Sequence, residues 1–360
     1  MIQFVATRLS KSVCERCHEQ EFTERCPERC QIRGINTLYT ILALILGTVN
    51  FANASTSHSG FINSDEIWTL AGSPHIIQSL TVVQNNATLT IEPGVEVRFN
   101  NDATNPSLII GEGGIDGKSG RLIAQGAATN KIIFTSNAAS PQPGDWSHIY
   151  FNNTAADDSI IENAVIEYAK DSIYLTSANP AIRNCIIRKN SNAGIYMMGT
   201  SSPEVSFCDI TENIYGIYSA ISSGTPKFIH NNISGNSSYG IYNPSSSIIL
   251  NAVNNWWGDP SGPYDPSDDT ASGGWYNPGG LGDKVSNHVK YTPWQNGIIS
   301  INGDVNGDSI VDLTDGIAVL QILSGIQSQI QINPGADVDN DGKITMAEEL
   351  YILQKIAGLR

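Results

Sequence analysis

The sequence predicts a mainly β protein, in which a solenoid of stacked parallel coils precedes a small α-helical module that binds calcium. Between residues 158 and 247 an Ile-Tyr pair returns roughly every 22–23 residues, surrounded by β-branched residues and without a helical stripe. After residue 301 one acidic pattern occurs twice, and the copies lie 33 residues apart. The Ile-Tyr repeat is typical of parallel β coils, and the acidic pattern is typical of calcium loops.

The N-terminal segment 1–54 has the features of a secretory signal with an upstream extension. The apolar run Thr37–Val49 follows Arg29 and Arg33, and small residues up to Ala54 offer a cleavage site. A membrane anchor is the alternative, but the run is shorter than the roughly 20 residues that span a bilayer. The segment predicts a secreted protein, extracellular or at the cell surface, that does not span the membrane after cleavage.

Four cysteines and a histidine in this segment have a spacing that could bind zinc. They are Cys14, Cys17, His18, Cys26 and Cys30. Because they precede the signal, they would be removed with it. An upstream extension, or a start codon assigned too early, is therefore favoured over a zinc site, and we exclude 1–54 from the predicted fold.

Residues 158–254 are predicted to form regular coils, because several residue types recur at a fixed phase. A proline, an isoleucine and an asparagine recur in each coil ahead of the Ile-Tyr pair. The recurring residues are Pro180, Pro203 and Pro226; Ile187, Ile210 and Ile233; Asn190, Asn213 and Asn236; and Tyr174, Tyr196, Tyr218 and Tyr242. Apolar residues at one phase would stack to fill the interior, and the asparagines can bond the backbone at a bend and one another.

This repeat resembles that of the right-handed parallel β-helix proteins. Segments 87–99, 120–126 and 131–136 look like the first coils of secreted members. The resemblance implies an N-terminal cap with less regular coils over 55–157, regular coils over 158–254, and a C-terminal cap and linker over 255–300. Such caps cover strand edges that would otherwise pair end to end.

Two pairs of residues near the coils have alternative interpretations. Trp256 and Trp257 interrupt the period, and we expect them to cover the last coil, although an exposed platform for sugar rings is the alternative. Cys185 and Cys208 share a phase in consecutive coils. We expect buried thiols rather than a disulfide, because side chains that stack in register have poor geometry for a bridge.

The two acidic repeats place oxygen ligands where EF-hand loops place them, including a main-chain carbonyl at the seventh position. The predicted ligands are Asp304, Asn306, Asp308, Ile310, Asp312 and Asp315 in the first loop, and Asp337, Asp339, Asp341, Lys343, Thr345 and Glu348 in the second. The sequence therefore predicts two Ca²⁺ sites. Ser309 replaces the loop glycine of the first site, so we expect that site to bind more weakly.

Each loop is followed by one helix and lacks the entering helix of an EF-hand, so residues 301–360 resemble the dockerin family. The apolar helix residues also match between the halves, as for Ile317 and Leu350. The resemblance implies a calcium-folded module that binds a cohesin-type domain on a scaffold or cell surface. The positions that select the partner in this family are occupied here by Leu313-Thr314 in the first half and by Met346-Ala347 in the second. Because these two pairs differ, they argue against two equivalent binding surfaces.

The coils show no catalytic signature. Glu167 and Arg188 share a phase and are predicted to form a surface ion pair. Asp209 and His230 are the best acid–histidine candidate. The signatures of pectin hydrolases are missing from the coils, and neither Gly-x-Ser-x-Gly nor His-Glu-x-x-His occurs in the sequence. A net charge of −15 without a basic stripe argues against nucleic acid as a partner.

We therefore predict a secreted calcium-binding protein that is tethered to a cohesin and binds polysaccharide or has a structural or adhesive role. The alternative is a polysaccharide-degrading enzyme, either a hydrolase of O-glycosyl bonds or a uronate lyase, with unknown catalytic residues. Many parallel β-helix proteins act on polysaccharides, but a fold does not locate a site. Tyr196, Tyr218 and Tyr242 favour the binding role.

Overall fold

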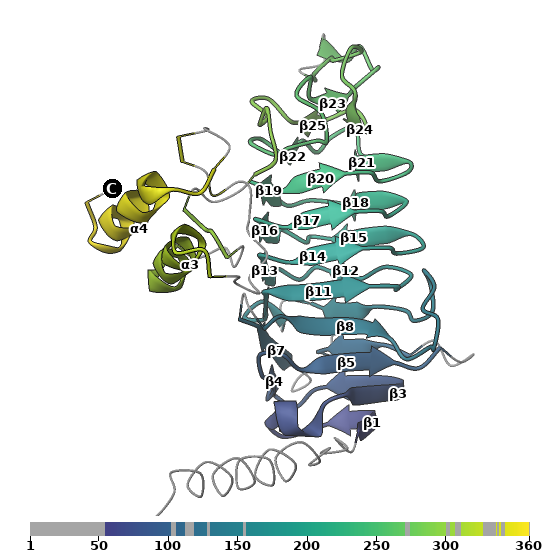
Figure 1. The fold of residues 1–360 in the computed structure, drawn as a ribbon. Helices are drawn as coiled ribbons and strands as arrows, with labels where there is room; N and C mark the ends of the chain where they lie inside the picture. Colours follow the sequence, from purple (N-terminus) through teal and green to yellow (C-terminus); the bar gives the residue numbers. More distant parts are fainter. Residues whose placement is uncertain are drawn as a thin grey trace, which may run out of the picture. The chain divides into compact units, whose positions relative to one another are not determined.

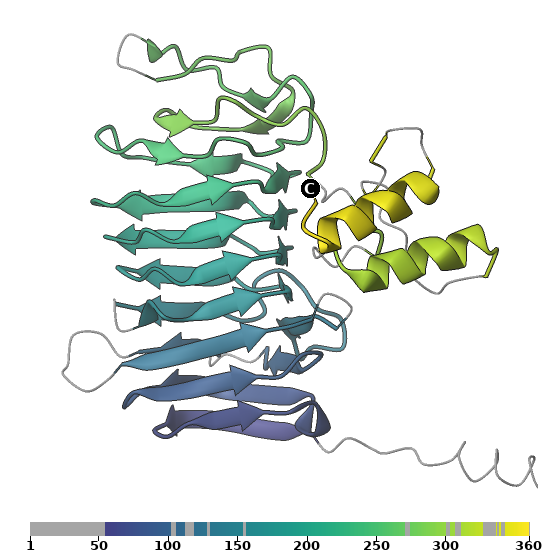
Figure 2. The ribbon, with the colours of Figure 1, turned by 90° about the vertical axis from the view of Figure 1, so that its left-hand side faces the viewer.

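The computed structural model describes residues 55–359, except 102–105, 112–118, 128–129, 154–155, 271–273, 300–302, 307–310, 327–335, 337 and 340–342. The predicted signal and the N-terminal cysteine cluster lie outside the described residues. The described chain is mainly β, and its coils stack as parallel layers (Figure 1, Figure 2). A coil passes through three strand positions in turn, which we call face 1, face 2 and face 3.

Face 1 is a nine-stranded parallel sheet. Its strands are β2 (Glu66–Trp68), β4 (Ala87–Ile91), β7 (Gly120–Gln125), β10 (Ile160–Glu162), β13 (Ala181–Arg183), β16 (Glu204–Ser206), β19 (Lys227–Ile229), β22 (Leu250–Asn251) and β25 (Val289–Lys290).

Faces 2 and 3 are joined through the long strand β3 (His75–Val83), which pairs with β5 along its first residues and with β6 along its last. Face 2 continues through β5 (Glu96–Phe99), β8 (Ile132–Ser136), β11 (Ala164–Glu167), β14 (Ile186–Arg188), β17 (Asp209–Thr211) and β20 (Asn232–Ser234). Face 3 continues through β6 (Leu108–Ile110), β9 (Ile149–Asn152), β12 (Ile173–Thr176), β15 (Ala193–Gly199), β18 (Tyr215–Ile221) and β21 (Tyr239–Tyr242).

The interior is filled by apolar side chains that stack from coil to coil. Ile187 pairs with Ile210, and Ile210 pairs with Ile233, as the sequence predicted. All three are fully buried. Alternate residues of each strand point inward, so a fixed phase in the sequence becomes a continuous column of core residues.

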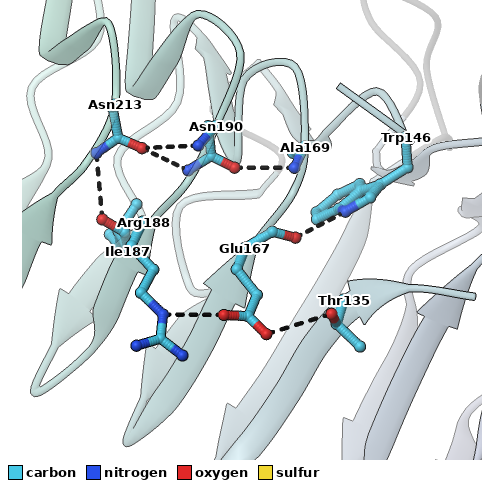
Figure 3. A network of polar contacts seen from close by, with 8 residues as sticks. All are labelled: Thr135, Trp146, Glu167, Ala169, Ile187, Arg188, Asn190 and Asn213. Atoms are coloured by element: carbon cyan, nitrogen blue, oxygen red, sulfur yellow. Dashed lines mark hydrogen bonds and ion pairs between the residues drawn. The ribbon is translucent and has the colours of Figure 1, made fainter. Parts of the chain in front are cut away.

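The corner between faces 2 and 3 is built by an asparagine ladder. Asn213 Oδ1 accepts hydrogen bonds from the side-chain amide (2.8 Å) and backbone N–H (3.2 Å) of Asn190, and the Asn213 amide donates to the Ile187 carbonyl (3.2 Å) (Figure 3). Asn190 repeats the pattern toward the previous coil by accepting from the Ala169 N–H. Lys189, just before Asn190, adopts a left-handed backbone conformation with φ 55°, so the chain bends there. The hydrogen bonds of the ladder satisfy the buried backbone groups at this bend.

Both ends of the solenoid are covered. At the start, β1 (Thr56–Ile62) pairs in parallel with β3, and the short 3₁₀ helix η2 (Leu70–Gly72) follows β2. At the other end, β23 (Pro263–Tyr264) and β24 (Gly282–Lys284) form a two-stranded cap. The carboxylate of Asp283 accepts from the Asn236 side-chain amide (2.8 Å), which ends the asparagine ladder.

Both predictions about the pairs of residues near the coils are confirmed. Trp257 is fully buried and Trp256 is 9 % exposed, so they close the last coil, and the interpretation as an exposed sugar platform is wrong. Cys185 and Cys208 are free, buried thiols.

The C-terminal module contains two helices, α3 (Leu313–Leu323) and α4 (Met346–Ile356). Each begins with a capping box, in which the cap side chain and the residue three positions later satisfy each other's backbone N–H groups. The helices enclose a small core of Val305, Ala318, Val319, Ala336 and Ile352.

Candidate functional sites

In the first half of the helical module, the carboxylate at loop position twelve belongs to Asp315 and is fully buried. It accepts hydrogen bonds from the backbone N–H groups of Asn306 (3.1 Å) and Asp312 (2.9 Å). Asp312 caps α3 by accepting from the Thr314 N–H at 2.7 Å. The position-twelve carboxylate therefore ties the loop to the start of the helix and is held in one orientation.

The second half repeats this arrangement around Glu348, which is also fully buried. Its carboxylate accepts from the backbone N–H groups of Val338 (3.1 Å) and Thr345 (2.5 Å). Burial alone would raise the pKa of Glu348, but these hydrogen bonds and one from the Thr345 hydroxyl hold it below its usual value. Glu348 is therefore kept as the anionic form that a cation requires.

Eight of the twelve predicted calcium ligands are described: Asp304, Asn306, Asp312, Asp315, Asp339, Lys343, Thr345 and Glu348. The other four, Asp308, Ile310, Asp337 and Asp341, lie outside the described residues. Within the described part of the chain, no group of three His, Cys, Asp or Glu side chains converges as a metal site. The residues nevertheless fit Ca²⁺, because their donors are all oxygens and because Asp304, like Asp315 and Glu348, is buried.

Helices α3 and α4 expose large apolar side chains. The exposed residues are Leu313, Ile317, Leu320 and Leu323 on α3 (44–61 % exposed) and Met346, Leu350, Leu353 and Ile356 on α4 (46–59 % exposed). Their spacing of three and four residues places each set on one helix face. Exposed apolar rows mark interaction surfaces. The two rows correspond at every position, although Thr314 and Ala347 beside them differ.

Face 3 carries a row of tyrosines that we call the tyrosine column: Tyr150, Tyr174, Tyr196, Tyr218 and Tyr242. Each is paired in register with the next along neighbouring strands. All five are half-buried and project from the outer surface, while the residues on either side of each face the core. The column therefore extends along the solenoid axis across five coils.

The central rings of the column stack face to face. The ring centroids of Tyr174 and Tyr196 are 4.9 Å apart with an interplanar angle of 1°, and those of Tyr196 and Tyr218 are 4.7 Å apart at 5°. Each ring covers the face of its neighbour, so the column presents ring edges and phenol groups to solvent. Burial raises the pKa of Tyr174, Tyr196 and Tyr218 above the usual value, so their hydroxyls remain O–H donors at neutral pH.

The two ends of the column differ in chemistry. At the end that begins with Tyr150, the ring centroid of His148 lies 5.2 Å from that of Tyr174. Burial and the charge of Lys170 lower the pKa of His148 to about 4, so this histidine is neutral at neutral pH. At the other, the rings of Tyr239 and Tyr242 lie 4.9 Å apart and are tilted by 54°. Both of these tyrosines line a pocket of about 390 Å³ between the last coil and the cap.

The predicted ion pair on face 2 is confirmed. Arg188 Nε donates to Glu167 Oε2 at 2.9 Å, and the other carboxylate oxygen accepts from the Thr135 hydroxyl at 3.4 Å (Figure 3). The Glu167 main-chain carbonyl accepts from the Trp146 indole at 2.9 Å. These contacts hold neighbouring coils together, and Glu167 is committed to this structural network.

The structure does not pair Asp209 with His230. Asp209 Oδ1 accepts from the Asn232 amide at 2.7 Å, whereas the His230 ring stacks on Phe207 at 5.2 Å. His230 occupies the corner between faces 1 and 2 with φ 55°. A left-handed corner residue turns its side chain away from the strand that follows, which the sequence phase alone did not show.

Other coil carboxylates are likewise engaged with groups that are not acids. Asp145 accepts from Ser136, Asp157 from Asn179, Asp171 from Asn192, and Glu162 from Gln125. Paired acids are the usual requirement for glycoside hydrolysis. The contacts of Asp157, Asp171 and Glu162 join neighbouring coils instead, and that of Asp145 lies within one coil.

Two family models match this chain. Residues 83–257 match the model described as right handed beta helix region, and residues 302–356 match the dockerin type I domain. No curated protein and no solved structure gives a significant match. No helix among the described residues is both long and apolar enough to cross a membrane. The chain therefore contains a right-handed parallel β-helix followed by a dockerin type I domain.

Proposed function

We propose that this chain is a secreted protein whose β-helix binds polysaccharide along the tyrosine column, and whose calcium-dependent dockerin domain tethers it to a cohesin. The observation that carries the binding role is the column itself, with five half-buried tyrosines in register on face 3. Tyrosine offers an apolar ring and a hydrogen-bonding tip, which match the C–H and hydroxyl groups of sugars.

The repeat of the column suits a polymeric ligand. Neighbouring strands lie about 4.8 Å apart, so equivalent phenol groups recur at that interval along the axis. An extended polysaccharide lying along face 3 would meet a tyrosine at each coil, although the hydroxyls of Tyr150 and Tyr174 donate to Thr176 and to Met198 within the protein. Because the central rings cover one another's faces, sugar contacts there would be made by edges and hydroxyls, and stacking would be confined to the ends.

The dockerin domain supplies the attachment. Dockerin type I domains in general bind calcium and cohesin domains. The apolar rows of α3 and α4 are the surfaces that we assign to the cohesin, and the twelve loop residues predicted above are assigned to two Ca²⁺ ions. Tethering of this kind places the protein outside the cell or at its surface, which agrees with the predicted signal.

The binding role is tested by replacing the two central tyrosines. In the full chain, Tyr196→Ala combined with Tyr218→Ala should weaken retention by a soluble polysaccharide in affinity electrophoresis by roughly tenfold or more, because two aromatic contacts are lost. The matching double substitution to phenylalanine keeps the rings and should cost less. Tyr264→Ala removes a tyrosine that is 40 % exposed in the cap, and should bind like the wild type.

The panel should include neutral and acidic polysaccharides. Unchanged retention of the alanine double variant on every polysaccharide that the wild type binds would refute the assignment of face 3. An equal loss for Tyr264→Ala would place binding elsewhere. Tryptophan fluorescence verifies folding, because all six tryptophans lie between residues 68 and 294.

A further inference from the structure

The pocket at the end of the tyrosine column combines aromatic and cationic side chains. It is lined by Tyr239 and Tyr242 from β21, by serines and Asn243 from the following loop, and by Lys284 and His288 from the cap. The Lys284 ammonium lies 4.6 Å from the centre of the Tyr239 ring. A cation above an aromatic face is held in place at little cost in side-chain entropy.

No acidic residue lines this pocket, although the chain carries a net charge of −15. The carboxylates of the cap accept hydrogen bonds from protein groups, and Asp269 Oδ2 accepts from the N–H of His288, which lines the pocket, at 3.3 Å. Asp283 accepts from Gly235 and Asn236, and Asp265 accepts from Ser267 and from Tyr291. Among the described residues, Lys284 has no acidic partner within ion-pair distance, so its charge is available to a ligand.

The aromatic part of the pocket differs from the rest of the column. Tyr239 and Tyr242 are tilted by 54° to each other, and Tyr242 is tilted by 50° to Tyr218, whereas the central rings are parallel. Tyr239 lies nearly parallel to Tyr215, with ring centroids 6.2 Å apart and an interplanar angle of 10°, whereas Tyr242 is tilted by 45° to Tyr215. Tyr242 is therefore not covered by a parallel ring, and a sugar ring can pack against it. A sugar that does so brings its substituents close to Lys284.

We propose that this pocket is an anchoring subsite for an acidic sugar, in which a carboxylate or sulfate group binds Lys284 while the sugar ring packs against Tyr242. The inference rests on the polysaccharide-binding role proposed above and gives it a ligand class. It predicts that the β-helix prefers acidic polysaccharides, although the protein itself is strongly acidic. The preference comes from one cation in a pocket free of acids.

The test compares three probes on the full chain: a uronate oligosaccharide, its methyl ester, and a sulfated oligosaccharide of similar length. The wild type should bind the uronate more tightly than the ester by roughly tenfold, the effect of one charge-assisted hydrogen bond. Lys284→Gln should remove this preference, and Lys284→Arg should retain it. Lys227→Gln, an exposed lysine on face 1, is the matched control and should leave the preference unchanged.

The outcomes separate the pocket from the column. Tighter binding of the sulfated probe than of the uronate would assign the pocket to sulfate, and the reverse would assign it to carboxylate. Equal binding of uronate and ester by the wild type, or a preference that survives Lys284→Gln, would overturn the subsite while leaving the column intact. If Lys284→Gln acts but the tyrosine double variant does not, the subsite stands and the role of the column fails.

Discussion

Asn213 shows how one side chain holds three coils. It is 2 % exposed, accepts from Asn190, and donates to the carbonyl of Ile187 and to Asn236 Oδ1. Asn213→Ala leaves several of these buried groups without partners, so we expect a loss of about 1–3 kcal/mol in unfolding free energy.

Ile210→Ala opens a cavity in the adjacent isoleucine stack, so it should lower the unfolding free energy by about 2–5 kcal/mol. Chemical denaturation measures both, and an unchanged midpoint for Ile210→Ala would contradict the register.

His58 makes the N-terminal cap sensitive to acid. Its ring stacks on Trp68 and its Nε2 lies 2.9 Å from Nδ1 of His75, with Glu66 at 3.6 Å. Burial, and then His75, lower the pKa of His58 to about 4, and burial also lowers the pKa of His75. Between that value and the ordinary value of about 6.5, the unfolded chain binds more protons than the folded one, so stability falls as the pH falls.

His58→Gln should therefore reduce the loss of stability between pH 6.5 and pH 4. The measurement is the denaturation midpoint of wild type and variant at several pH values in this window. Part of the dependence should remain in the variant, because burial lowers the pKa of His148 to about 4 as well. Parallel pH curves for the two proteins would show that the cap histidines do not contribute.

At the scale of elements, the loops and helices of the dockerin domain depend on each other. The position-twelve carboxylates are buried and bind the backbone of their loops, while the residues at position nine cap α3 and α4. If the loops hold Ca²⁺ as proposed, its removal would leave these buried carboxylates without a compensating charge, so the energy of calcium binding would also be energy of folding.

Chelation of calcium should therefore unfold the helices and leave the β-helix folded. In the full chain, the helical circular dichroism signal should fall on addition of a chelator, while tryptophan emission, which reports only on residues 68–294, should stay constant. Calcium should restore the signal. A helical signal that does not respond to the chelator would contradict the assignment of the loops.

Much of this architecture could be predicted because a solenoid turns sequence phase into spatial neighbours. The isoleucine stack, the asparagine ladder and the Glu167–Arg188 pair all follow from residues one period apart. The pocket beside Lys284 could not be predicted in this way, since the cap that supplies it has no period. The separation of Asp209 from His230 was missed because the left-handed corner changes the direction of the side chain.

At the scale of the whole molecule, the proposed function gives the two parts separate roles. The coil carboxylates join neighbouring coils, as Glu167 and Asp209 do, whereas face 3 presents tyrosine to solvent. Under the function proposed above, the dockerin domain would determine where this surface is displayed.

The most direct test of this account is prolonged incubation of the full chain with the polysaccharides that it retains, followed by assays for new reducing ends and for unsaturated products. We expect neither product above a blank without protein, while binding persists. Turnover that disappears in Asp209→Asn or Glu167→Gln would make the coils catalytic and contradict the account. Turnover that survives both substitutions would contradict it equally, and would place the catalytic residues outside these two positions.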